Sequence, residues 1–203
     1  GQLMITTNAH IGNYGVHNTE AESEYMKIEG LICKNFNSGF SREAGDGDLQ
    51  DYFIKQKKVV ISDVDTRAVV RHIRDKGAMN AIISTAGNNI AELTQLLAEV
   101  PSMEGLELSS SVCTKAPYFV GNEKASNKIA VLDLGVKRNI LKCLTDRDCY
   151  LQVFPMHTSY QEMNAWNPDG FFLSNGPGDP SAMPIVIEEV KKVTADGKPV
   201  FGI

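Results

Sequence analysis

Residues 175–180, with the sequence Asn-Gly-Pro-Gly-Asp-Pro, are the part of the chain whose residue types and spacing best suit chemistry. They directly follow an apolar segment, residues 171–174, that we predict to be a strand. Glycines on both sides of a proline make a rigid turn whose backbone N–H groups can point out of a sheet. Rigid, uncharged donors suit a developing oxyanion because they need not reorganise during reaction. The local pattern alone leaves an ordinary tight turn between strand and helix open as the alternative.

The four cysteines show neither the spacing of a metal site nor the setting of a nucleophile. None stands between glycines on a turn from strand to helix. Cys143 falls inside a predicted helix, and Cys149 precedes a predicted strand. We therefore interpret all four as packing or surface residues and expect no metal site in the chain. They are Cys33, Cys113, Cys143 and Cys149.

The histidines and the loop at residues 133–139 offer no further site. The loop follows a predicted strand but lacks Gly-x-Gly-x-x-Gly, and it is short and basic rather than rich in hydroxyl groups. The sequence therefore does not support a dinucleotide or flavin site, and we expect no cofactor in this chain. Spacing assigns no histidine as a general base; the four are His10, His17, His72 and His157.

Length and charge restrict the class of protein. A chain of 203 residues allows one large domain or two small ones. The net charge of -5, with a pI near 5.4, argues against nucleic acid or an anionic membrane as the main partner, because both select for excess Lys and Arg. No apolar run approaches the roughly 20 residues of a membrane helix. Four cysteines without a disulfide framework favour the reducing cytoplasm.

The second region of the chain predicts the sheet that would position residues 175–180. Strands separated by helical patterns of roughly 10–15 residues are typical of a doubly wound, mainly parallel sheet, in which functional groups gather at the carboxyl ends of strands. The strands are predicted at residues 128–134, 150–154, 171–174 and 200–203, and the helices near 136–144, from Ser159, and at 182–194.

The first region, residues 1–120, mixes strands and helices without a repeat and predicts a mixed α+β domain. A linker is expected at 121–127 and the first part of the second domain at 128–203. Within the first region we predict strands at 59–62 and 81–84. Helices should follow them, one from Asp65 or Thr66 to Gly77 and one from Asn88 or Asn89. The second helix is expected to bury Ile90, Leu93, Leu96 and Leu97.

Arg67, Arg71 and Arg74 fall along one side of the first of these helices. They could form a docking face for an acidic partner. The alternative is a solvated face whose arginines pair locally with Asp63, Asp65 and Asp75.

Residues 172–180 together with Pro-Val-Phe-Gly-Ile at 199–203 resemble a class I glutamine amidotransferase domain. In that family a Gly-x-Cys-x-Gly elbow follows the strand, and Gly202 and Ile203 match its first two positions. The resemblance implies that the nucleophilic cysteine is the residue after Ile203, so we expect the chain to be a fragment. By the same match, Gly176 would donate its N–H to the tetrahedral oxyanion and Gly178 would contact glutamine.

The chain as a whole resembles the small, glutamine-hydrolysing subunits of carbamoyl phosphate synthetase. The resemblance rests on residues 10–16, 29–32, 63–79 and 131–140. It implies a heterodimer in which ammonia from glutamine passes to a large subunit, which uses ATP, Mg and bicarbonate to make carbamoyl phosphate for arginine and pyrimidine synthesis. The catalytic His/Glu pair would lie beyond Ile203, and a glutamine-contacting Ser before Gly1. A non-catalytic module that regulates a synthetase partner is the alternative.

We predict that the 203-residue chain alone hydrolyses no glutamine, because no thioester can form without the nucleophile. Ammonia release from glutamine measures this directly. Turnover of about 1 per second or more would place the nucleophile inside residues 1–203 and contradict the match.

Overall fold

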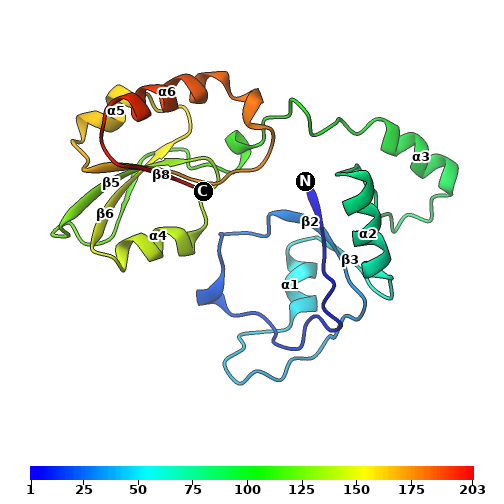
Figure 1. The fold of residues 1–203 in the computed structure, drawn as a ribbon. Helices are drawn as coiled ribbons and strands as arrows, with labels where there is room; N and C mark the ends of the chain where they lie inside the picture. Colours follow the sequence, from blue (N-terminus) through cyan, green and yellow to red (C-terminus); the bar gives the residue numbers. More distant parts are fainter. The chain divides into compact units, whose positions relative to one another are not determined.

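The computed structural model describes residues 1–203, which divide into two compact units, Gly1–Ser102 and Met103–Ile203 (Figure 1). The division falls earlier than the boundary near residue 120 that we predicted. Strand β4 (Tyr118–Val120) pairs antiparallel with β6 (Cys149–Pro155), so it belongs to the sheet of the second unit. The linker expected at 121–127 therefore lies inside the second unit, where residues 121–126 connect β4 to the next strand, β5 (Asn127–Asp133). No helix in the structure is both long and apolar enough to cross a membrane.

The first unit contains a parallel sheet of three strands in the order β1-β2-β3. Its strands are β1 (Gln2–Ile5), β2 (Ile28–Ile32) and β3 (Val59–Ile61). Its helices are α1 (Leu49–Lys55), α2 (Thr66–Lys76), α3 (Ile90–Ala98) and the short 3-10 turn η1 (Asn18–Glu20).

The boundaries of α2 are those that the sequence predicts. The carboxylate of Asp65 accepts a hydrogen bond from Ala68 N at 3.0 Å and caps the first turn. Gly77 ends the helix with a φ of 88° and donates its N–H to Ile73 O at 2.8 Å. Both end signals act within one turn of the chain, which is why the sequence alone reveals them.

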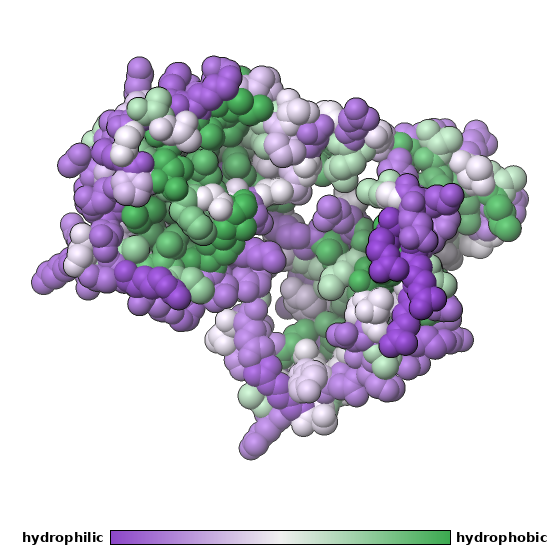
Figure 2. Space-filling model, in the orientation of Figure 1, coloured by the Kyte–Doolittle hydropathy of each residue, from purple (hydrophilic) through white to green (hydrophobic).

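Two predictions about the first unit are wrong. Residues 81–84 form no strand, although their local sequence suits one. Helix α3 begins at Ile90 behind a capping box from Asn89, as expected, but Ile90 is 84% exposed and Leu96 45% exposed. The apolar side of α3 packs extensively on no other helix or strand, and Figure 2 shows apolar surface there. The local sequence pattern is enough to form the helix, whereas burial of its apolar side chains requires another element to pack against.

The second unit is the doubly wound sheet that the sequence predicts. The strand order is β4-β6-β5-β7-β8, and every pairing except that of β4 is parallel. Its remaining strands are β5 (Asn127–Asp133), β7 (Gly170–Leu173) and β8 (Val200–Gly202). Its helices are α4 (Arg138–Thr145), α5 (Tyr160–Ala165) and α6 (Pro184–Ala195), with the 3-10 turns η2 (Ser109–Ser111) and η3 (Pro180–Ala182).

Helices cover both faces of this sheet, and β5 lies at its centre (Figure 1). Leu132 of β5 packs in a cluster with residues of α5 and α6, whereas Val131, one position earlier, packs in a second cluster with Leu141 of α4. Successive side chains of a strand point to opposite faces, so one strand supplies both clusters. The continuous apolar run of β5 follows from burial on both sides.

We expect Leu132→Ala to lower the free energy of unfolding by about 2–5 kcal/mol, because this side chain is 1% exposed and its loss leaves a cavity in the core. Ile185→Ala is the matched control, since Ile185 is 66% exposed and its truncation should change stability by about 0.5 kcal/mol or less. Urea unfolding of both variants measures the difference. Equal costs would show that β5 is not the centre of the core.

Candidate functional site

Residues 175–180 lie where two neighbouring parallel strands end. β5 and β7 are adjacent, with Leu132 opposite Leu173. The helix after β5, α4, and the helix after β7, α6, cover opposite faces of the sheet (Figure 1). The two connections therefore leave the sheet in opposite directions, which creates the switch point at which doubly wound sheets bind ligands.

Gly176 has room for no side chain. A Cβ atom at this position would lie 2.2 Å from Leu134 O and 2.7 Å from the Ser109 hydroxyl oxygen. Its φ is outside the left-handed region, so close approach of other atoms, rather than torsion, requires glycine here. The residue is exposed and its N–H donates to no acceptor of the chain. Gly176 thus presents a fixed backbone donor with no partner in the protein.

Gly178 is required for two reasons. Its φ of +95° lies in a region that other residues rarely adopt. A Cβ atom would also lie 2.6 Å from Leu106 O and 2.9 Å from Leu108 N. Its N–H likewise has no acceptor within the chain. The structure therefore brings the two predicted site residues onto one loop, each with a free N–H group.

The loop after β5 is tied to the loop after β7. The Asp133 carboxylate ends β5 and accepts 2.8 Å hydrogen bonds from Gly135 N and Val136 N. The buried hydroxyl of Ser174 accepts from Leu134 N at 2.8 Å and donates to Asn175 O at 2.8 Å. These bonds hold Leu134 O in the position where it crowds Gly176.

The side-chain amide of Asn175 adds one further contact. Its Nδ2 donates to Gly135 O at 3.4 Å, while its buried Oδ1 has no donor within the chain. The hydrogen bond from Asn175 to Gly135 therefore joins the loop after β7 to the loop after β5, as the Ser174 hydroxyl does.

A third segment, residues 105–114, crosses this site, and we call it the strap. Gly105 N donates to the Asp179 carboxylate at 2.9 Å, and Thr114 N donates to the Asp133 carboxylate at 2.7 Å. Between these ends, the Ser109 hydroxyl donates to Pro177 O at 3.2 Å. The strap is therefore fastened at both ends by carboxylates, one at the last residue of β5 and one in the loop after β7.

Sequence reasoning missed the strap because it assigned residues 105–114 to the first region. Both end contacts use main-chain N–H groups of the strap, which carry no sequence signal. The acceptors of these contacts do carry a sequence signal, since Asp133 ends a buried strand and Asp179 lies in the loop after the next strand of the sheet.

Two carboxylates at the strap have lowered pKa values. Hydrogen bonding from the Gly105 backbone N–H, followed by bonds from Ser181, lowers the pKa of Asp179 below its ordinary 3.8. Hydrogen bonding from Ser110 lowers the pKa of Glu107 below its ordinary 4.5. Both groups are therefore charged near neutral pH, which strengthens the bonds that they accept.

Two of the four cysteines, Cys33 and Cys149, have pKa values raised above the ordinary value for a thiol. Burial raises the pKa of Cys33 in the first unit and, with a smaller contribution from Asp148, that of Cys149. A raised pKa disfavours the thiolate, which is the nucleophilic form. Cys143 is exposed on α4 and Cys113 follows η2. No group of three or more acidic, histidine or cysteine side chains is placed to hold a metal ion.

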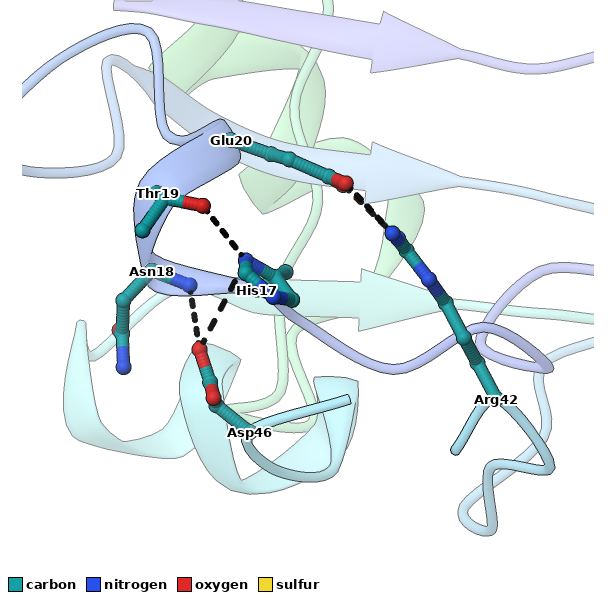
Figure 3. Close-up of polar contacts among 6 residues, drawn as sticks. All are labelled: His17, Asn18, Thr19, Glu20, Arg42 and Asp46. Atoms are coloured by element: carbon teal, nitrogen blue, oxygen red, sulfur yellow. Dashed lines mark hydrogen bonds and ion pairs between the residues drawn. The ribbon is translucent and has the colours of Figure 1, made fainter. Parts of the chain in front are cut away.

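A separate polar cluster in the first unit has a local role (Figure 3). Arg42 donates to both oxygens of Glu20, at 2.8 and 2.6 Å. The Asp46 carboxylate accepts from Asn18 N at 2.6 Å and lies 3.9 Å from His17. These contacts fasten the turn η1 to residues 42–46, so the cluster holds two connections together.

The family comparisons match both halves of the chain. Residues 1–83 match the family model described as "Carbamoyl-phosphate synthase small chain, CPSase domain". Residues 130–203 match the model described as "Glutamine amidotransferase class-I", and this range includes Gly176 and Gly178.

Curated proteins named carbamoyl phosphate synthase small chain are similar to the whole chain. The protein from Neisseria meningitidis serogroup A is 39% identical over 215 residues, and that from Vibrio parahaemolyticus is 37% identical over 219. The protein from Chlorobaculum tepidum is 37% identical over 206 residues. Each alignment covers 100% of this chain but only 57%, 58% and 56% of the respective relative. The chain thus spans little more than half the length of these relatives.

The two lowered pKa values predict how the strap responds to acid. A carboxylate with a depressed pKa stabilises the fold above its unfolded pKa and loses that contribution as pH falls through its folded pKa. We expect the bonds to Asp179 and Glu107 to be complete above about pH 4.5 and to weaken only below their ordinary values of 3.8 and 4.5. The pH dependence of the Gly105 and Ser110 amide chemical shifts measures this. Midpoints above the ordinary values would contradict it.

Proposed function

We propose that the chain forms part of a glutamine-hydrolysing subunit, because residues 1–83 match the model for carbamoyl-phosphate synthase small chains and residues 130–203 match the model for class I glutamine amidotransferases. The activity proposed for the full-length protein is hydrolysis of glutamine to glutamate and ammonia. The observation that carries the proposal is the pair of free backbone N–H groups, at Gly176 and Gly178, fixed at the switch point of the sheet.

The proposed chemistry explains why uncharged donors are placed there. A glutamine amide is a poor electrophile, so its hydrolysis calls for a thiolate nucleophile and for stabilisation of the tetrahedral oxyanion. We assign the oxyanion contact to Gly176 N–H and a glutamine contact to Gly178. The carboxylate and the histidine that would complete the mechanism are expected after Ile203.

The position of β8 supports a nucleophile just beyond Ile203. Gly202 of β8 lies opposite Leu173 of β7, and Ile203 N donates to Leu173 O at 3.2 Å. A cysteine following Ile203 in the longer protein would therefore emerge at the same sheet edge as Gly176. Apolar surface around β8, including Phe201 at 63% exposure, supports further packing there in the full-length protein (Figure 2).

We further propose that the first unit contacts a large subunit, which would use ATP, Mg and bicarbonate to convert the ammonia into carbamoyl phosphate. Arg67, Arg71 and Arg74 are exposed along α2 and form no ion pair within the chain. Asp63 instead pairs with Lys34 at 2.8 Å, and Asp65 caps the helix. Three unpaired guanidinium groups in a row suit an acidic surface of a partner.

All four cysteines are free thiols in the structure, which fits the reducing cytoplasm as the expected location. We propose that the full-length protein, with its large subunit, supplies carbamoyl phosphate to arginine and pyrimidine synthesis.

We predict that Gly176→Val in the full-length protein, in complex with the large subunit, lowers glutamine-dependent synthesis about 10²–10³-fold. The new side chain cannot fit 2.2 Å from Leu134 O, so the N–H must move from the oxyanion position. Ammonia-dependent synthesis should be unchanged, because free ammonia bypasses this site. Assays with the two nitrogen donors on the purified complex measure both.

Gly39→Val is the matched control, because a Cβ atom at Gly39 would meet nothing within 4 Å. It should leave both rates near wild type. If the Gly176 variant shows wild-type rates with both glutamine and ammonia, the loop is an ordinary turn without a catalytic role. A full-length wild type that hydrolyses no glutamine would favour a regulatory module instead.

A further inference from the structure

Asp179 joins the Gly-Pro-Gly loop to the strap. One carboxylate oxygen accepts from Ser181 N at 2.9 Å and caps the turn η3. The other accepts from Gly105 N at 2.9 Å, from a residue 74 positions away in the chain. The Asp179 backbone N–H also donates to Leu106 O at 2.9 Å. Each oxygen thus has a distinct role, one local and one at the strap.

Ser109 makes a third hydrogen bond between the strap and the loop. This residue is fully buried, and its hydroxyl donates to Pro177 O at 3.2 Å. Every peptide bond in the chain is trans, and the C=O and N–H of a trans peptide point in opposite directions. A bond that holds Pro177 O therefore fixes the direction of the Gly178 N–H, which has no acceptor of its own within the chain.

We propose that Asp179 is a positioning residue of the glutamine site, whose carboxylate anchors the strap so that Ser109 sets the direction of the Gly178 N–H. This role rests on the proposed function, which places glutamine against Gly178. Without the anchor the donor is still present, but the Pro177–Gly178 peptide can rotate away from the productive direction. Orientation lost in this way lowers the rate without removing any group that touches substrate.

Asp179→Ser separates the anchor from the local cap. A serine hydroxyl still caps η3 by accepting from Ser181 N, but serine has no second oxygen for Gly105 N. Asp48→Ser is the matched control. Asp48 accepts from Gln50 N, two residues later, in the same way, but it lies in the first unit, whereas the strap belongs to the second.

The experiment compares four variants of the full-length protein in complex with the large subunit. They are Asp179→Ser, Ser109→Ala, the double variant and Asp48→Ser. We expect each of the first two to lower kcat/KM for glutamine roughly five- to tenfold, as for the loss of one hydrogen bond. Because both act through the same peptide, the double variant should be no slower than either single variant. Asp48→Ser should match wild type, and ammonia-dependent synthesis should be unchanged throughout.

Hydrogen–deuterium exchange provides a readout that is independent of activity. Peptides covering residues 103–110 should exchange faster in Asp179→Ser than in wild type or Asp48→Ser. Unchanged exchange, faster exchange with an unchanged kcat/KM, or losses that multiply in the double variant would each overturn the positioning role.

Failure of the proposed function gives a different result. If the wild-type complex hydrolyses no glutamine, the glutamine site and the role of Asp179 in it are both overturned. The exchange measurement then still decides whether Asp179 anchors the strap.

Discussion

Crowding of backbone atoms at the carboxyl ends of β5 and β7 is the constraint on which the candidate site depends. Leu134 O lies so close to Gly176 that a Cβ atom there would be 2.2 Å from it. The crowding follows from topology, because β5 and β7 are adjacent and parallel while their connections leave to opposite faces. A residue without a side chain satisfies the packing and leaves its N–H exposed. One geometric requirement therefore produces both the tight turn and the free donor.

Two carboxylates stand beside a site that is proposed to bind a developing negative charge, and the structure reduces their repulsion. The Asp133 side chain accepts three backbone N–H bonds, two from its own loop and one from Thr114. The Asp179 side chain accepts two, from Ser181 and Gly105. N–H dipoles that point at a carboxylate offset its charge locally. The acidic groups thus fasten backbone segments, and the N–H groups of Gly176 and Gly178 are left unpaired.

The sequence revealed features whose causes are local or periodic. The capping box at Ser159, the end of α2 at Gly77 and the alternation of strands and helices after residue 127 are all present. Features that require a distant partner were not found. Residues 81–84 have the apolar character of a strand but form none, and the apolar side of α3 packs extensively on no other helix or strand. The sequence did not predict the position of the strap, because the strap contributes only main-chain N–H groups to the contacts at its ends.

The proposed anchoring of the strap gives the carboxylate at residue 179 a role beyond the cap of η3. The chain leaves the first unit at Ser102, and Gly105 is the first strap residue tied to the Gly-Pro-Gly loop. Along the chain from Ser102, the bond between Gly105 and Asp179 comes before the bond made by Ser109. If the bond between Gly105 and Asp179 were absent, the strap would still be joined to the loop by the main-chain bond from Asp179 N to Leu106 O and to Asp133 through Thr114, but no charged acceptor would hold its near end. A charged acceptor at the near end makes this tie stronger than a neutral one would, so under the proposal the Asp179 carboxylate helps to fix the direction of the Gly178 N–H.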